Sequence, residues 1–223
     1  MAFSQKNSVH PHNNHIWIEI RDQRLFDLLR PHFQGFSTFT GMVPGIDARH
    51  IYMQREHLKQ LIPQPAELQA LPSPNKTIYN DLVKLLEYIE QEFADVTREM
   101  EYMNTDKEDP RIKWDLLWAL LTPGELLETT ETVSGLDMAF KPRTWLYADN
   151  DNENSSSSSE PCFIVRGEFL QWTGYEYSQI HFKRTIKKYT GTESIHTLAF
   201  KRLTSARKAS FMGKYPSGSE KWY

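Results

Sequence analysis

The segment of residues 112–126, with the sequence IKWDLLWALLTPGEL, constrains the fold most because the pattern of the chain changes there. Its apolar residues recur at i, i+3, i+4 and i+7, which predicts a short amphipathic helix that ends before residues 123–124. Segments before it have mainly helical patterns, whereas segments after it alternate like strands. The sequence therefore predicts an α+β protein, with a mainly helical part over residues 15–124 and a β module over residues 125–203.

This switch segment also predicts a structural junction, formed by Trp114, Trp118, Pro123 and Gly124. Trp114 and Trp118 lie four residues apart, so they share one face of the predicted helix. We expect the two indoles to wedge between the longest helix and the first β strand and to bury the junction.

The longest helix is predicted over residues 78–103. Its apolar positions are three and four residues apart, and Leu82, Ile89, Val96 and Met103 repeat every seven residues. Two interpretations stay open: this face packs on the Trp114/Trp118 helix of the same chain, or it binds a coiled-coil partner. Upstream, residues 50–54 are predicted to form a short strand and the proline-rich residues 63–75 an extended linker.

The β module is predicted to be a small antiparallel five-stranded sheet, closed or semi-closed like a barrel, because closure removes exposed sheet edges. Outside it, residues 1–14 are predicted to be disordered, and residues 204–223 are a basic tail. A serine-rich insertion over residues 149–160 is also predicted to be disordered. The five strands are expected at about 125–133, 136–148, 161–172, 175–188 and 194–200.

Composition favours an intracellular protein, cytoplasmic or nuclear. The single cysteine, Cys162, has no partner for an internal disulfide. The N-terminus lacks the apolar core of a signal peptide, and no run approaches the ~18 apolar residues of a membrane span. We therefore expect no membrane association, while the oligomeric state is left open.

Charge is unevenly distributed along the chain. Residues 1–160 carry 15 Lys or Arg and 25 Asp or Glu, whereas residues 161–223 carry 11 and 4. An acidic helical part and a basic β part indicate that the two parts face different partners, or each other.

A partner surface is predicted on the strand of residues 175–188. Alternation places aromatic and basic side chains on one face, and such a row can hold single-stranded nucleic acid by stacking and phosphate attraction. A protein partner and an ordinary half-exposed strand are the other interpretations. The candidate residues are Tyr175, Tyr177, His181, Lys183 and Lys187.

No catalytic, cofactor-binding or metal-binding residues are predicted, so we expect a protein that is not an enzyme. His10, His12 and His15 lack the spacing of a zinc site. A P-loop requires a glycine five residues before its Gly-Lys pair, but Lys208 holds that position before Gly213 and Lys214. ATP binding through a P-loop is therefore not expected.

The chain resembles the uncharacterised region, a domain of unknown function, that precedes the ATPase module in large fungal AAA-type ATPases. The resemblance rests on residues 18–30, 85–93 and 115–126, which occur in the same order, and on the β segments 169–174, 186–191 and 194–198.

This resemblance implies a recognition or regulatory domain that binds a protein partner or substrate and has no catalytic residue of its own. In the family, ATP hydrolysis belongs to a separate C-terminal domain. The alternatives are a module that binds single-stranded nucleic acid and a fragment of an ATP-hydrolysing AAA protein whose motor lies outside this chain.

Overall fold

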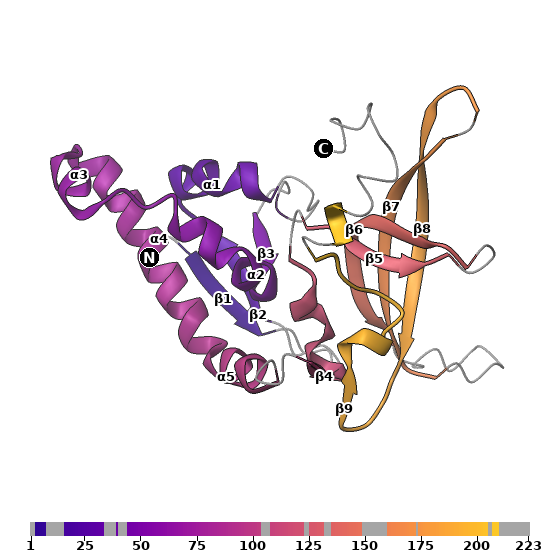
Figure 1. The fold of residues 1–223 in the computed structure, drawn as a ribbon. Helices are drawn as coiled ribbons and strands as arrows, with labels where there is room; N and C mark the ends of the chain where they lie inside the picture. The colour runs from indigo at the N-terminus through magenta and orange to yellow at the C-terminus, as the bar shows by residue number, and fades with distance from the viewer. Residues whose placement is uncertain are drawn as a thin grey trace, which may run out of the picture. The chain divides into compact units, whose positions relative to one another are not determined.

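The computed structural model describes residues 3–7, 16–33, 39, 44–103, 108–122, 125–131, 135–148, 160–172, 174–204 and 207–209. The chain divides into two compact units, Met1–Thr105 and Asp106–Tyr223, and each is described by itself (Figure 1). Helices and antiparallel strands both occur, which confirms the predicted α+β class. No helix in the described part of the chain is long and apolar enough to span a membrane.

The first unit contains a three-stranded antiparallel sheet in the order β1-β2-β3. Its strands are β1 (Phe3–Asn7), β2 (Ile16–Ile20) and β3 (Gly45–Asp47). The helices are α1 (Gln23–Leu29), α2 (Ala48–Lys59), α3 (Pro65–Ala70), α4 (Ser73–Glu92) and α5 (Ala94–Met103), with a short 3-10 helix, η1, at Arg30–His32.

Aspartate caps explain where two of these helices begin. The Asp22 carboxylate accepts from the backbone N–H groups of Arg24 and Leu25 at the start of α1. Asp47 accepts from the N–H of Arg49 at the start of α2. Such caps satisfy backbone donors that a helix leaves unpaired. The core of the unit is made of fully buried aliphatic side chains, among them Ile18, Leu25, Ile46, Ile51, Leu58, Leu82, Leu85 and Ile89.

Several local predictions for the first unit are wrong. Residues 50–54 lie inside α2 rather than in a strand, since the Asp47 cap starts a helix there. The predicted linker contains α3 and the start of α4, because prolines occupy the first turns of both helices, where they are tolerated. The predicted single helix is divided at Phe93 into α4 and α5. Residues 3–7, predicted to be disordered, pair with β2.

The second unit contains the five-stranded antiparallel sheet that the sequence predicts. The strand order is β10-β5-β6-β7-β8. The strands are β5 (Leu127–Thr130), β6 (Asp137–Ala148), β7 (Cys162–Trp172), β8 (Tyr177–Lys187) and β10 (Lys201–Arg202). A separate ladder joins β4 (Arg111–Lys113) to β9 (Thr192–Ser194), and two 3-10 helices, η3 and η4, span Trp114–Leu120 and Ile195–Thr197.

The sheet is not closed into a barrel, so this part of the prediction is wrong. The predicted fifth strand, residues 194–200, does not form as one strand. Its first residue ends β9, which pairs with β4, and η4 follows. Only Lys201 and Arg202 pair with β5. Two residues are too few to form a ladder with the 11-residue strand β8 at the opposite edge.

The inner face of this sheet is aromatic. Phe140, Phe163 and Phe200 are fully buried, and the ring centroids of Phe140 and Phe182 are 4.7 Å apart. Gly167 on β7 lies so close to β6 that an added Cβ would be 2.6 Å from Phe140 Cδ2 and 2.8 Å from a backbone carbonyl. This close approach requires glycine.

The Trp114/Trp118 segment forms the 3-10 helix η3 rather than the predicted α-helix, and it is buried in the second unit. Trp114 and Trp118 are 7% and 4% exposed. Trp114 packs edge-to-face on Tyr147 of β6 at 4.6 Å, and Trp118 stacks on Trp145 at 6.4 Å. The Tyr147 hydroxyl donates to the Trp114 carbonyl at 3.1 Å.

These contacts join η3 to β6 within one unit. The predicted wedge against the long helix, which belongs to the other unit, stays a prediction. Pro123 and Gly124 lie outside the described residues, as do residues 149–159 of the predicted insertion and most of the predicted tail.

Candidate interaction surface

Strand β8 carries four of the five predicted partner residues on one exposed face. Tyr177, His181, Lys183 and Lys187 alternate with the half-buried or buried residues of the inner face. Tyr175 lies in the loop before β8 and is 94% exposed, while Tyr177 is 60% exposed. The structure therefore brings the basic residues into one row and places both tyrosines at its beginning.

The β7–β8 ladder extends beyond the rest of the sheet. β7 pairs with β8 from Cys162 to Trp172, but it pairs with β6 only from Cys162 to Glu168. Residues 169–180 consequently form a two-stranded arm with its connecting loop, and this arm projects past the other strands of the unit (Figure 1). Gly174 has φ +103° in the loop, a conformation that favours glycine.

At the base of the arm, Glu168 is a mostly buried carboxylate with basic side chains beside it. The Glu168 side chain forms an ion pair with Arg143, and it lies 4.0 Å from His181 Nδ1. The hydrogen bond from Arg143 holds the pKa of Glu168 below its usual value, and Gln179 contributes a further hydrogen bond. At the far end of β8, the Lys187 ammonium lies 2.8 Å from Glu160, which raises the pKa of Lys187 and lowers that of Glu160.

Two cations remain side by side on the same face. Arg166 of β7 lies directly opposite Lys183 of β8, and both side chains are exposed. No acidic group within the described ranges forms an ion pair with either of them. Like charges directly opposite each other destabilise a strand pair, so this position favours an anionic ligand.

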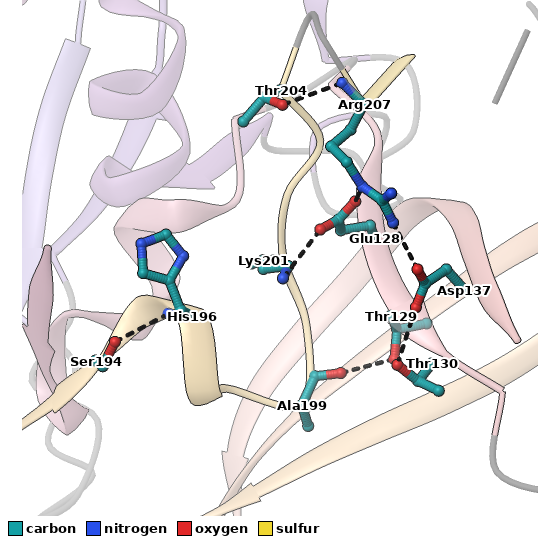
Figure 2. A network of polar contacts seen from close by, with 10 residues as sticks. All are labelled: Glu128, Thr129, Thr130, Asp137, Ser194, His196, Ala199, Lys201, Thr204 and Arg207. Carbon is teal, nitrogen blue, oxygen red and sulfur yellow. Dashed lines mark hydrogen bonds and ion pairs between the residues drawn. The ribbon is translucent and has the colours of Figure 1, made fainter. Parts of the chain in front are cut away.

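A second polar cluster, which the sequence analysis missed, fastens residues 207–209 to the sheet (Figure 2). The Glu128 side chain on β5 is 7% exposed and lies 3.1 Å from Lys201 Nζ and 3.0 Å from Arg207 Nε. Arg207 also lies 2.6 Å from Asp137 on β6, and its hydrogen bond lowers the pKa of Asp137. The sequence signal that could have indicated this cluster was Glu128, a charged residue that follows two leucines within a predicted strand. Nothing in the sequence identified its partners.

A pocket of about 290 Å³ is lined by residues 113–115 and 188–191. Two of its polar side chains make structural contacts: the Tyr189 hydroxyl donates to the Ile112 carbonyl at 3.1 Å, and Lys188 Nζ lies 5.2 Å from the centre of the Trp114 ring. Burial raises the pKa of Tyr189. The lining residues include no histidine or cysteine, and the carboxylate among them is Asp115.

The remaining candidates for nucleophilic or metal-binding roles are the single cysteine and the histidines near the N-terminus. Cys162 begins β7 and is half-buried. His10, His12 and His15 lie outside the described residues. Among the residues that the structure describes, no group of three or more His, Cys, Asp or Glu side chains could hold a metal ion.

Comparison with known proteins gives one match. Residues 103–205 are similar to a family described as a domain of unknown function (DUF7025). The matched range includes the sheet from β5 to β10, the arm and η3. No curated protein and no solved structure matches the chain.

Proposed function

We propose that the chain is a non-catalytic recognition domain whose second unit binds a protein partner through the β7–β8 arm. The observation that carries this proposal is the extension of the β7–β8 ladder past β6, with Tyr175 and Tyr177 exposed on it. An isolated two-stranded hairpin is marginally stable in water, so a partner would stabilise the arm. Tyrosine is also enriched at the energetic centres of protein interfaces.

We further propose that this domain selects a substrate or regulates activity for a fungal AAA-type ATPase. The support is the resemblance on six segments, four of which, residues 115–126, 169–174, 186–191 and 194–198, lie within the range similar to DUF7025. The arm begins within one of these four segments. Titration with ATP and Mg²⁺ should then give no saturable binding by this chain, and hydrolysis would contradict the non-catalytic assignment.

The test of partner binding is an affinity-capture comparison between variants. The double substitution Tyr175→Ala/Tyr177→Ala removes both exposed rings of the arm without touching the core. Tyr102→Ala is the matched control, since Tyr102 is also exposed but lies on α5 of the other unit. Partners that bind the arm should be lost with the double variant and retained with the control. Equal capture by all three proteins would refute the proposal.

Single-stranded nucleic acid is the second candidate ligand. The opposed cations Arg166 and Lys183, on the face that continues toward the arm with its two tyrosines, favour it. Binding of an oligonucleotide should weaken steeply with salt, and the double tyrosine variant should lose roughly 1–3 kcal/mol per stacked base. If neither RNA nor DNA binds at low salt, this candidate is rejected.

The third candidate is a fragment of an ATP-hydrolysing AAA protein. It is tested by reading the coding sequence that follows Tyr223, where a P-loop would support it and a stop codon would reject it.

A further inference from the structure

The backbone of β8 presents unpaired hydrogen-bonding groups along its outer edge. The N–H of Lys188 donates to the Pro161 carbonyl at 2.8 Å, which makes residues 161 and 188 a hydrogen-bonded pair of the antiparallel ladder. Hydrogen-bonded and non-hydrogen-bonded pairs alternate in such a ladder. Every second pair, from Cys162↔Lys187 to Trp172↔Tyr177, is therefore non-hydrogen-bonded. The backbone groups of those β8 residues point away from β7.

These outward-pointing groups belong to the residues whose side chains form the exposed row. β8 is the last strand in the sheet order, so no strand of the sheet lies beyond it. Within the described part of the chain, the backbones of Gln179, His181 and Thr185 have no hydrogen-bond partner on this side. The Lys183 carbonyl accepts from the Arg184 guanidinium at 3.3 Å. Apart from that carbonyl, the segment from Gln179 to Thr185 is open to a further strand.

The charges beside this edge determine which kind of strand can pair with it. A second copy of β8 would bring its own lysines against Lys183, and like charges on an edge oppose such pairing. An acidic strand would instead place carboxylates near His181, Lys183 and Arg166. Glu168, which lies on this face directly opposite His181, is mostly buried and already has Arg143 and His181 beside it.

We propose that an acidic, extended segment of a partner protein adds to the edge of β8 as a further strand, along Gln179–Thr185. Main-chain hydrogen bonds would supply binding, and alternate glutamate or aspartate side chains would contact Lys183 and Arg166. This inference rests on the proposed function, because it names the chemistry of the partner that the arm binds.

The test uses three synthetic peptides of about eight residues, within the usual strand length. The first alternates threonine and glutamate, the second has the same sequence with N-methyl groups on a central glutamate and the adjacent threonine, and the third alternates threonine and lysine. The first peptide should bind the full chain and slow amide hydrogen exchange at Gln179, His181 and Thr185. The N-methylated peptide keeps the charge but loses an N–H that faces β8, whichever way the added strand runs, so it should bind at least about tenfold more weakly. The lysine peptide should not bind.

Protein variants test the charge requirement. Lys183→Glu and Arg166→Glu should each weaken binding of the acidic peptide by about tenfold or more, a change of about 1.4 kcal/mol. Lys84→Glu makes the same charge change on α4, where Lys84 is exposed, and should leave binding unchanged.

Four results would overturn strand addition. They are no binding of the acidic peptide, equal binding of the N-methylated peptide, self-association of the chain that protects the same amides, and tighter binding of an oligothymidine of about twelve nucleotides. The tyrosine variants separate this inference from the proposed function. If they lose captured partners while Lys183→Glu retains them, the arm binds a protein but not by acidic strand addition.

Discussion

The guanidinium of Arg184 on β8 reaches across the inner face of the sheet to β5, where its Nε donates to the Thr129 hydroxyl at 2.9 Å and its Nη2 donates to the Thr130 carbonyl at 3.0 Å. β5 and β8 are not neighbours in the strand order. One side chain thus joins two strands that the backbone ladder leaves apart.

Replacing Arg184 should therefore weaken the second unit. We expect Arg184→Gln to lower the free energy of unfolding by about 1 kcal/mol, the usual net contribution of a hydrogen bond. Denaturant unfolding monitored by tryptophan fluorescence measures this change. Lys183→Gln, on the exposed face of the same strand, is the control. It should not lower the free energy of unfolding, since it removes a like charge opposite Arg166. Equal losses in the two variants would show that Arg184 does not hold β8 to β5.

Trp118 should be essential for the stability of the second unit because it is 4% exposed and stacks on Trp145. Trp118→Ala should cost about 3–5 kcal/mol, the range for emptying a large aromatic site, against a typical total of about 5–15 kcal/mol. Thermal and chemical unfolding would measure it, with Tyr175→Ala as an exposed aromatic control. A melting temperature within a degree or two of wild type would contradict the packing of η3 on β6.

His50 should make stability depend on pH. Burial lowers its pKa to about 4, with smaller effects from Asp47, which raises it, and Arg49, which lowers it. Because the folded pKa lies below the unfolded value of about 6.5, the contribution to stability is complete above pH 6.5 and decreases as the pH falls toward 4. The slope is at most about 1.4 kcal/mol per pH unit.

A His50→Gln variant should show a flatter stability profile between pH 4 and 6.5 than wild type. His196→Gln is the control, since His196 is exposed. Urea unfolding at several pH values provides the measurement. Parallel profiles for wild type and His50→Gln would mean that burial does not keep this imidazole neutral.

Arg207 should control the titration of Asp137. The hydrogen bond between them lowers the folded pKa of Asp137, so its contribution to stability is present above the unfolded value and is lost as pH falls through the folded pKa. Arg207→Ala should raise the Asp137 pKa toward its ordinary value, as carbon-detected NMR of the carboxyl group can measure. Lys187→Ala should instead raise the pKa of Glu160 and leave Asp137 unchanged.

Local sequence patterns predicted most strands of the second unit well. β6, β7 and β8 lie within a few residues of the predicted ranges, because alternation and turn residues act over a few positions. The exposed row on β8 was predictable for the same reason, since period two determines which side chains share a face. The apolar spacing also predicted a helix that contains Trp114 and Trp118, although the helix there is a short 3-10 helix.

Partners distant in sequence could not be predicted in this way. Residues 194–200 were predicted to be one strand, yet β9 pairs with β4, some 80 residues earlier in the chain, and β10 pairs with β5. The four-residue extension of β7 past β6 depends on where the β6–β7 ladder ends. Neither feature leaves a periodic signal, because strand register is a property of two segments together.

The sequence by itself thus determined the α+β class, the main strands of the sheet and the exposed side chains of β8, because each depends on neighbouring residues and their period. Only the tertiary structure decided that the sheet stays open, that Arg184 spans it, that Glu128 is held by Lys201 and Arg207, and that β8 is an edge. These outcomes depend on long-range packing and on which backbone groups find partners, and a single strand's pattern does not specify them.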